Sequence, residues 1–368
     1  MKKRLGIVTV GGDCSGLNSI IRGAVVRADM IGCELFGIYR GFFGLFPESF
    51  NCVSLTAKDI GEELLTSSGS ILCSDTKSFT TNLEHGRSQK EILQLVCDGY
   101  KKLSLDGLIY IGGDGSLTIL KELLDYAPDL MNVVAIPKTI DNDVNGTDFS
   151  VGFSTAVEVV ADAISKVRST AKSHQRTIIV EVMGRDAGFI ALYAGVASGA
   201  DIILVPEFEF EMSRVVSRVK ENYDSGKKYC IIIVAEAVEA VNLKHQDSIP
   251  CGESSKYHLI KYKGIGQYIA DYLKNVGFES RAVILGHIQR GGTTVILDRI
   301  IGTSFGVEAV NSLIAGERSI MLCYRGKQIE KISISELMRG INKRLDESDI
   351  CVKIAHNLGV YIGESCSL

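Results

Sequence analysis

Short apolar runs alternate with amphipathic helical segments along most of this chain, and this alternation constrains the fold more than any other feature. The predicted strands are rich in β-branched residues: Leu5–Val10, Leu35–Tyr39, Leu108–Ile111, Val133–Ile136, Thr177–Val182, Ile202–Val205, Tyr229–Val234 and Ala282–Leu285. The predicted helices are Leu17–Met30, Ile92–Lys102, Leu117–Tyr126, Thr155–Lys172, Val215–Tyr223 and Ile265–Val276. Buried strands joined through helices form parallel sheets with helices on both faces. The pattern therefore predicts an α/β fold.

Length, charge and cysteine content narrow the class of protein. The 368 residues, 46% of them apolar, suit two domains or one large α/β unit. The net charge is −4 and no Lys/Arg block occurs, so we expect no nucleic-acid partner. The first apolar run is interrupted at Gly12 and Asp13, too early for a signal peptide or a membrane span. Ten cysteines without a Cys-x-x-Cys pair indicate reduced thiols and a cytoplasmic location.

Three of the predicted strands, the first, third and fourth, are followed by unusual polar loops. The loops are Gly-Gly-Asp-Cys-Ser-Gly-Leu-Asn (11–18), Gly-Gly-Asp-Gly-Ser (112–116) and Pro-Lys-Thr-Ile-Asp-Asn-Asp (137–143). In parallel sheets, ligands bind outside the carboxyl ends of the strands. Glycines there let the backbone approach a ligand, and amides at a helix start can point at phosphate oxygens.

Carboxylates in two of these loops suit a metal-assisted reaction. Asp114 can face a phosphate only with a cation between them, and Mg²⁺ takes one or two carboxylates together with phosphates and water. Asp141 and Asp143 are two residues apart in a stretch that we expect to be extended, so they would fall on one side. One could then act as a base while the other serves the metal. The alternatives are a tight turn with Asp114 as helix N-cap and an Asx-type turn at Thr139–Asp143.

Charged residues near other strand ends suit a phosphorylated ligand. Arg176 and Arg185 flank one predicted strand, and guanidinium groups match phosphate oxygens. Glu236 follows another strand and can accept hydrogen bonds from sugar hydroxyls. His287 and Arg290 flank a glycine-rich turn. The alternatives are surface arginines in ion pairs, a solvated glutamate and a structural histidine.

Together, five motifs resemble those of the phosphofructokinase family, in the family's order and spacing over residues 5–305. They are Gly-Gly-Asp-Cys-Ser-Gly-Leu-Asn (11–18), Gly-Gly-Asp-Gly-Ser (112–116), Pro-Lys-Thr-Ile-Asp-Asn-Asp (137–143), Met-Gly-Arg (183–185) and Gly-His-Ile-Gln-Arg-Gly-Gly (286–292). The resemblance implies a glycolytic phosphotransferase that converts fructose 6-phosphate to fructose 1,6-bisphosphate with Mg²⁺ and a phosphoryl donor.

The resemblance also implies a role for each matching residue. Asp141 would be the general base for the sugar 1-hydroxyl, and Thr139, Lys138 and Arg185 would serve the transferring phosphoryl group. Mg²⁺ would be held by Asp114 and Asp143, directly or through water. The donor site would be lined by Gly11, Gly12, Gly112, Gly113, Gly115, Ser116 and Lys77. Fructose 6-phosphate would contact Thr139, Asp141, Arg176, Met183, Gly184, Arg185, Glu236, Arg281, His287 and Arg290.

Subunit contacts are implied as well. In the family, arginines that match Arg176 and Arg281 reach the sugar phosphate across a subunit interface. We therefore expect a homodimer or a homotetramer in which these two residues serve a neighbouring subunit's site.

Two residues bear on the identity of the donor. Family members that use pyrophosphate typically carry Asp at the position of Gly115 and Lys at that of Lys138, whereas typical bacterial ATP users carry Gly at both. A carboxylate at position 115 would crowd and repel the α-phosphate of ATP, and a lysine at 138 can accompany either donor. We therefore expect ATP, with a pyrophosphate-dependent transferase as the alternative.

The chain departs from the family pattern in two places. Thr76 stands where the family's donor-side stretch carries an arginine, and Lys77 replaces that arginine only if the loop shifts by one residue. Ser15 takes the place of the usual proline in the first loop. The first departure leaves a non-catalytic, metabolite-binding paralogue as a second alternative. NAD and lipid kinases share the Gly-Gly-Asp-Gly loop but not the other motifs.

For the architecture we expect two Rossmann-like three-layer α/β domains with mostly parallel sheets and the active site in the cleft between them. Residues 1–150 would bind the donor nucleotide and residues 151–288 would bind fructose 6-phosphate. The chain would return to the first domain over 289–340 and end in a C-terminal extension at 341–368. An amphipathic helical region is expected at Ile332–Ile350.

Overall fold

The computed structural model describes residues 2–75, 86–238, 264–337 and 342–365, and the chain divides into two compact units. Unit 1 comprises Met1–Thr155 and Arg290–Lys343, and unit 2 comprises Ala156–Gln289 and Arg344–Leu368. The chain therefore passes from unit 1 to unit 2, returns, and crosses once more near its end. From residue 344 onward, the segment expected as a separate extension belongs to unit 2.

Unit 1 is built on a sheet of eight strands among the described residues. They are β1 (Arg4–Thr9), β2 (Glu34–Ile38), β3 (Cys52–Leu55), β4 (Gly107–Gly112), β5 (Val133–Thr139), β6 (Val151–Gly152), β12 (Ile320–Arg325) and β13 (Gln328–Ser333). The order is β13-β12-β5-β4-β1-β2-β3, with β6 beside β5. Only β3 and β13, at the edges, pair antiparallel with their neighbours. The carboxyl ends of β1, β4 and β5 consequently meet at one edge of the sheet.

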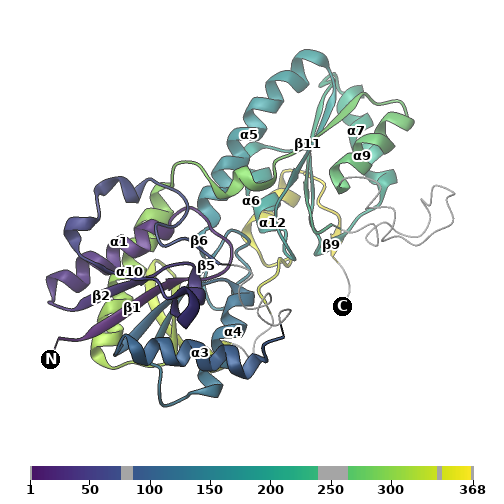
Figure 1. Ribbon diagram of the computed structural model, residues 1–368. Helices are drawn as coiled ribbons and strands as arrows, with labels where there is room; N and C mark the ends of the chain where they lie inside the picture. The colour runs from purple at the N-terminus through teal and green to yellow at the C-terminus, as the bar shows by residue number, and fades with distance from the viewer. Residues whose placement is uncertain (1, 76–85, 239–263, 338–341, 366–368) are drawn as a thin grey trace. The chain divides into compact units, whose positions relative to one another are not determined.

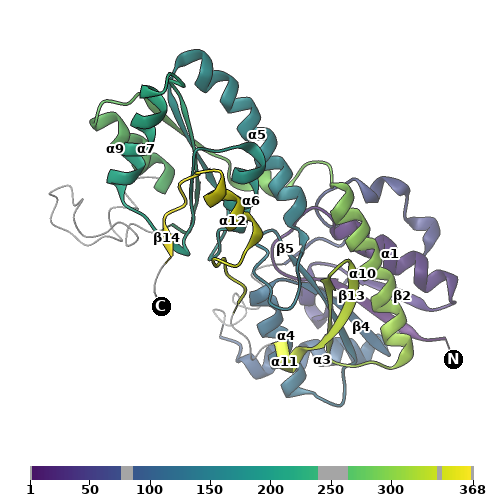
Figure 2. The same cartoon turned by 180° about the vertical axis from the view of Figure 1, so that it is seen from behind.

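Helices cover both faces of this sheet, as Figures 1 and 2 show. One face carries α1 (Leu17–Met30) and α10 (Ile296–Ala315), which pack against each other, and the other carries α3 (Gln89–Lys102) and α4 (Asp114–Tyr126). Alternate strand residues pack on the α3 and α4 side: Val8, Val10, Leu108, Tyr110, Val133 and Ala135. The intervening residues are also buried, so the strands are apolar throughout, as parallel strands covered on both faces must be.

Local signals fix where several shorter elements begin. A capping box starts α3, because Ser88 Oγ accepts from the amide of Glu91 and the Glu91 carboxylate accepts from the amide of Ser88. Single-turn helices follow β2 and β3: η1 (Gly41–Leu45), η2 (Pro47–Ser49), η3 (Ala57–Asp59) and η4 (Glu62–Leu65). The short helix α11 (Ile334–Leu337) follows β13.

Unit 2 contains a parallel four-stranded sheet in the order β11-β7-β10-β8. Its strands are β7 (Thr177–Val182), β8 (Ile202–Leu204), β10 (Cys230–Ala235) and β11 (Ser280–Ile284), and β9 (Phe208–Glu209) pairs separately with β14 (Glu364–Ser365). The helices are α5 (Phe153–His174), α6 (Phe189–Ser198), α7 (Met212–Asp224), α9 (Ile265–Asn275) and α12 (Ile350–Asn357), with the turn η6 (Gly286–Arg290). In Figure 1, α7 and α9 lie on one side of the sheet, and α6 and α12 lie on the other.

The mixed α/β architecture with mostly parallel sheets confirms the predicted fold class, and every strand and helix predicted before residue 332 is present with similar bounds. The helical region predicted at Ile332–Ile350 is wrong. A two-residue hairpin turn with positive φ at Gly326 and Lys327 instead pairs β13 with β12 as far as Ser333. Between there and α12, the only helix among the described residues is α11.

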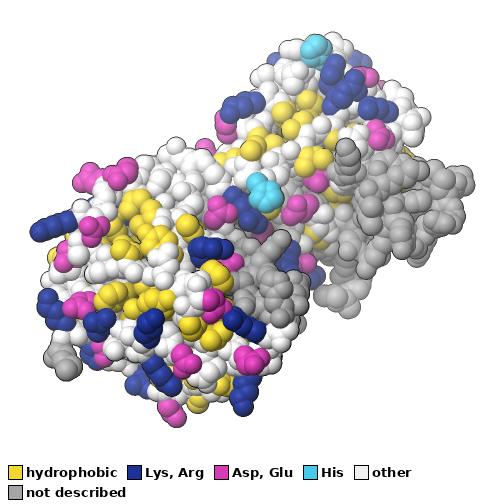
Figure 3. Space-filling view, viewed as in Figure 1, with side chains coloured by type: hydrophobic (Ala, Val, Ile, Leu, Met, Phe, Trp, Pro, Cys, Tyr) yellow, Lys and Arg dark blue, Asp and Glu magenta, His cyan; other side chains and the backbone are white. Residues whose placement is uncertain are grey.

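The surface is of mixed charge. Figure 3 shows Lys and Arg side chains interspersed with Asp and Glu on the visible face of unit 1. Among the residues that the structure describes, no helix combines the length and the apolar character needed to cross a membrane.

A buried carboxylate joins α10 to the start of α5. Asp298 is fully buried, and its oxygens accept hydrogen bonds from the Gly152 amide (3.0 Å) and from the amide (2.7 Å) and hydroxyl (2.6 Å) of Thr155. The Thr155 amide is one of those that the first turn of a helix leaves without helical partners. Burial raises the pKa of Asp298, although these hydrogen bonds oppose the shift.

The variant Asp298→Asn tests this junction. It should lower the free energy of unfolding by about 1–3 kcal/mol, because an amide NH₂ cannot accept and leaves a buried donor unsatisfied. Asp162→Asn, on α5 in an exposed pair with Lys166, is the control and should cost less than about 0.5 kcal/mol.

Denaturant unfolding at several pH values checks both the size and the sign of this effect. Because the pKa of Asp298 is raised in the folded state, wild-type protein loses this carboxyl's contribution as pH rises from 3.8 through the folded-state pKa. The stability gap to Asp298→Asn should therefore narrow over that range. Equal stability of the two proteins would contradict the assignment.

Candidate active site

Three loops pack closely at the carboxyl edge of the unit 1 sheet, after β1, β4 and β5. A Cβ atom on Gly11 would lie 2.7 Å from Ser116 Oγ, and one on Gly113 would lie 3.0 Å from the carbonyl oxygen of Lys138. Gly11 also has a φ of 89°, in the left-handed region. The loops therefore approach one another at distances that favour glycine.

Lys138 lies beneath the first of these loops. It is 3% exposed, and its Nζ donates to the carbonyl oxygen of Gly12 at 2.6 Å. Nζ also lies 3.4 Å from the position that a Cβ on Gly11 would take. Burial lowers the pKa of this amine. The side chain that the sequence assigns to the donor phosphates thus also supports the backbone of the Gly11–Gly12 loop.

Local hydrogen bonds fix the loop after β5. The amide of Asp141 donates to Thr139 Oγ1 at 3.2 Å, and Asn142 accepts from the amide of Ser150 at 2.9 Å through its side-chain oxygen. Asn142 has a φ of 53°, which breaks the extended conformation. The stretch is therefore not extended at Asn142, so the period-of-two argument that placed Asp141 and Asp143 on one side does not apply. Their directions are set by a left-handed residue and its hydrogen bonds.

Two carboxylates that the resemblance assigns to Mg²⁺ lie in the loops that follow β4 and β5. Asp114 begins α4 directly after Gly113, and Asp143 is buried in the loop after β5. Mg²⁺ usually takes one or two carboxylates and fills its remaining positions with phosphate oxygens and water. That Asp114 and Asp143 hold Mg²⁺ stays a prediction.

Arg290 lies against the loop after β1. Its Nη1 is 2.8 Å from the position that a Cβ on Gly12 would take and 3.7 Å from the Asp13 carboxylate. Its Nε is buried and has no hydrogen-bond partner among the described residues. An arginine that the resemblance assigns to the sugar phosphate thus also borders the loop expected to bind the donor.

The stretch that precedes residue 76 packs on the same loop. The Gly11 amide donates to the carbonyl oxygen of Asp75 at 2.9 Å. Ser15, where the family usually has proline, lies 2.7 Å from Ser68 between the two hydroxyl oxygens. Lys77 lies outside the described residues, so its contact with the donor stays a prediction.

At the carboxyl end of β7 in unit 2, a buried amide side chain joins two loops. The Met183 amide donates to Gln289 Oε1 at 3.2 Å, and Gln289 Nε2 donates to the carbonyl oxygen of Gly286 at 2.9 Å. Gln289 is 1% exposed. It therefore holds the Met183–Arg185 loop beside the turn that carries His287. Sequence reasoning missed Gln289, because its partner lies 106 residues away.

Polar side chains at this edge of unit 2 are open to solvent. Arg185 has a side chain that is 79% exposed, and His287 and Glu236 are also exposed. Beside them, burial raises the pKa of Glu181 on β7, and the negative charge of Glu236 adds to the shift. These exposed groups suit direct contact with a ligand.

Arg176 and Arg281 lie at the opposite edge of this sheet. Arg176 precedes β7, and Arg281 is the second residue of β11, where it pairs with Glu279 at 2.8 Å. The six residues of β7 separate this end from the Met183–Arg185 loop by roughly 20 Å. The structure therefore does not bring Arg176 and Arg281 together with Arg185 within one chain.

The contacts described above unite most of the residues predicted in unit 1. Those linked to one another are Gly11, Gly12, Gly113, Ser116, Lys138, Thr139, Asp141 and Arg290. Gly115 is exposed in the first turn of α4, and Gly112 ends β4. In unit 2, Met183, Gly184, Arg185 and Glu236 follow the carboxyl ends of neighbouring strands.

Comparison with known proteins identifies the family. The family model described as "Phosphofructokinase" matches residues 4–313. The "ATP-dependent 6-phosphofructokinase 1" of Nostoc sp. is 41% identical over 365 residues, which are 98% of this chain and 99% of that protein. The "Pyrophosphate--fructose 6-phosphate 1-phosphotransferase" of Dictyoglomus thermophilum is 38% identical over 347 residues, 94% of this chain and 96% of that protein. This chain belongs to the phosphofructokinase family.

A solved structure agrees with this assignment. The Pichia pastoris phosphofructokinase in the T-state is 30% identical, with a TM-score of 0.76 over 92% of this chain. The chain spans 38% of the length of that Pichia protein.

Substitution at Gly11 tests the close packing of the loops. Gly32→Ala (φ 72°, no atom of the described residues within 4 Å) should lower the free energy of unfolding by about 1–2 kcal/mol because of its left-handed φ. Gly11→Ala should cost more, by about 1–3 kcal/mol, because its Cβ would also lie 2.7 Å from Ser116 Oγ. Only Gly11→Ala should also raise KM for the phosphoryl donor, by about tenfold, because its Cβ meets Ser116. Equal effects of the two variants on KM would refute the packing argument.

Proposed function

We propose that this protein is an ATP-dependent 6-phosphofructokinase, which transfers the terminal phosphoryl group of ATP to the 1-hydroxyl of fructose 6-phosphate. The observation that carries the proposal is the convergence of the loops after β1, β4 and β5, which brings Gly11, Ser116, Lys138 and Thr139 into contact. The names of the relatives support the substrate. The proposal places the reaction in the cytoplasm, in keeping with free thiols at the eight described cysteines.

The residues of unit 1 have distinct roles in this proposal. Asp141 accepts the proton of the sugar 1-hydroxyl, and Thr139, whose hydroxyl lies 3.4 Å from the Asp141 carboxylate, orients it. Backbone amides near Gly11 and at the start of α4 bind the donor phosphates. Magnesium, held by Asp114 and Asp143, supplies charge neutralisation for the phosphoryl oxygens when it is bound.

Unit 2 supplies groups for the sugar phosphate. Arg185 stabilises charge on the transferring phosphoryl group, and Glu236 and His287 bind sugar hydroxyls and phosphate. Gln289 hydrogen-bonds the backbone of Met183 and Gly286, and so fixes the loops that carry Arg185 and His287.

ATP is favoured over pyrophosphate by the position of Gly115. It is exposed in the first turn of α4, where donor phosphates meet the amides of the helix N-terminus. Without a side chain, this position leaves room for the α-phosphate of a nucleotide. Lys138, buried against the Gly12 carbonyl, is compatible with either donor.

Two variants at one position test this choice of donor. Gly115→Asp should raise KM for ATP by about tenfold or more through charge repulsion, whereas the isosteric Gly115→Asn should raise it far less. Steady-state formation of fructose 1,6-bisphosphate is measured with ATP and with pyrophosphate in parallel. Wild-type activity with pyrophosphate alone would overturn the ATP assignment and favour the pyrophosphate-dependent alternative.

A second pair of variants tests the base. Asp141→Asn should lower kcat by about 10²–10⁴-fold and leave KM for both substrates nearly unchanged. Asp148 lies in the same loop, where its carboxylate accepts a hydrogen bond from the Gly326 amide (2.9 Å), and the control variant Asp148→Asn should keep most of its activity. An Asp141→Asn enzyme with near wild-type kcat would exclude Asp141 as the base.

The proposal includes at least a homodimer. Arg176 and Arg281 lie at the amino ends of β7 and β11, away from Arg185, so one chain cannot direct all three at one sugar phosphate. A second copy that contributes its own Arg176 and Arg281 resolves this, and it gives each site residues from two chains.

Complementation tests the shared site. Asp141→Asn and Arg281→Ala should each be nearly inactive alone, and co-expression should restore about a quarter of wild-type activity, because half of randomly mixed dimers carry one intact site. Absence of restored activity, with mixed oligomers shown by mass spectrometry, would assign Arg281 to its own chain.

A further inference from the structure

The segment where the chain crosses from unit 1 to unit 2 for the last time is bonded to a loop in unit 1. The crossing falls between Lys343 and Arg344. The backbone N–H of Lys343 donates to the carbonyl oxygen of Asp143 at 3.0 Å. Its Nζ donates to the carbonyl oxygens of Thr147 at 3.2 Å and Asp148 at 2.8 Å. One lysine thus makes three hydrogen bonds to the loop that follows the proposed base.

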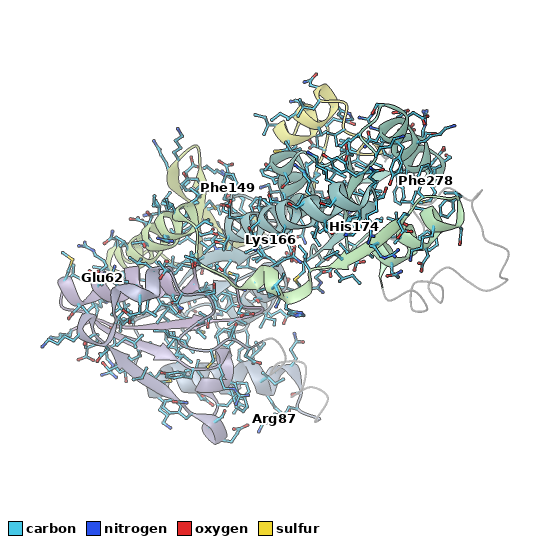
Figure 4. The ribbon with its side chains drawn as sticks, turned by 90° about the horizontal axis from the view of Figure 1, so that it is seen from above. Glu62, Arg87, Phe149, Lys166, His174 and Phe278 are labelled. Atoms are coloured by element: carbon cyan, nitrogen blue, oxygen red, sulfur yellow. The ribbon has the colours of Figure 1, made fainter. Side chains whose placement is uncertain are left out.

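The far side of this loop is fixed by other contacts. The Asp148 amide donates to the carbonyl oxygen of Tyr324 on β12 at 2.8 Å, and the ring of Phe149 stacks on Phe153 with centroids 6.0 Å apart. Figure 4 labels Phe149 at the end of the loop. Asn142 Nδ2 donates at 3.1 Å to the same Asp148 oxygen that Lys343 contacts. Lys343 therefore supplies the hydrogen bonds that hold the part of the loop nearest Asp143.

The residues just after the crossing are bonded to a loop in unit 2. The carboxylate of Glu207 accepts from the Leu345 amide at 3.3 Å, and its two oxygens lie 3.0 and 3.1 Å from the Gly188 amide. Gly188 is the N-cap of α6 and follows the Met183–Arg185 loop by three residues. The side chain of Leu345 is buried, which anchors the segment in unit 2.

We propose that Lys343 and Glu207 are positioning residues for phosphoryl transfer, joined by the segment 343–345. Lys343 holds the backbone of the loop that carries Asp143 and follows Asp141, and Glu207 holds the Gly188 amide, three residues after the Met183–Arg185 loop. This inference rests on the proposed function, because it assigns the two loops to the metal and to the sugar phosphate. A side chain that is displaced by a fraction of an ångström loses much of its catalytic effect, so such supports are felt in turnover.

The unit 1 side is tested through the magnesium dependence. Lys343→Met removes the two Nζ hydrogen bonds and keeps the backbone one. It should lower kcat by about tenfold and raise the Mg²⁺ concentration for half-maximal activity several-fold, with KM for fructose 6-phosphate within about twofold of wild type. Lys343→Arg, which retains donors, should recover most of the loss. Lys353→Met is the matched control, because Lys353 also donates to a carbonyl, that of Ser348, but contacts neither loop.

In unit 2, substitution of Glu207 should change KM for fructose 6-phosphate rather than the Mg²⁺ dependence. Glu207→Ala should raise KM for fructose 6-phosphate by about fivefold to tenfold and leave the Mg²⁺ dependence unchanged. Glu207→Gln keeps one acceptor oxygen for the Gly188 amide and should be intermediate. Glu347→Ala, in a pair with His356, is the matched control and should behave as wild type.

Hydrogen exchange of the full-length protein decides the inference independently of activity. Lys343→Met should speed amide exchange in residues 141–150 and not in 186–190, and Glu207→Ala should do the reverse. Exchange unchanged from the control variants, or faster in both loops of both variants as in a general loss of stability, would overturn the inference. If wild-type protein forms no fructose 1,6-bisphosphate, the proposed function fails and the exchange result alone decides whether the two residues hold these loops.

Discussion

The close approach of backbone at the carboxyl ends of β1, β4 and β5 is the constraint on which the rest of unit 1 depends. The loops that follow these strands fit together because Gly11 and Gly113 lack side chains at the contact points. Lys138 then occupies the space below, where its ammonium group satisfies the Gly12 carbonyl. Parallel strands supply this arrangement, since their carboxyl ends, the following helix N-termini and the polar loops all lie at one edge. The close packing of these three loops is therefore a direct consequence of the sheet order.

Unit 2 has a similar parallel sheet but carries candidate site residues at both of its edges. Its polar residues divide between the two ends of β7, with Arg185 after the strand and Arg176 before it. The buried amide of Gln289 joins the loops at the carboxyl end, and the partly buried carboxylate of Glu207 supports the start of α6. The final crossing of the chain at residues 343–345 bonds to loops of both units. The end of the chain therefore bonds to one loop in each unit.

The sequence was sufficient for the elements that were predicted, because each predicted strand is a short apolar run and each predicted helix has an apolar face. The bounds of β7 and α1 agree with the prediction to the residue. The helix α10 was not predicted, because its own apolar residues lie on several of its faces and weaken the helical periodicity of the sequence. The turn at Gly326 and Lys327 depends on two positive φ angles. It was not predicted, because the apolar spacing of the following segment indicated a helix. Side chains such as Gln289, Lys343 and Glu207 act on partners distant in sequence, so no local pattern could reveal them.

The claim that unites these observations is that one chain carries the groups for phosphoryl transfer from ATP to a sugar phosphate. Phosphorus NMR of the purified protein with Mg²⁺ and fructose 6-phosphate tests it most directly, because donor and product are observed together. With ATP, we predict the appearance of ADP and of a second sugar phosphomonoester, and no change when fructose 6-phosphate is omitted. ATP that remains intact while pyrophosphate is consumed, or the absence of any new phosphomonoester with either donor, would contradict the account.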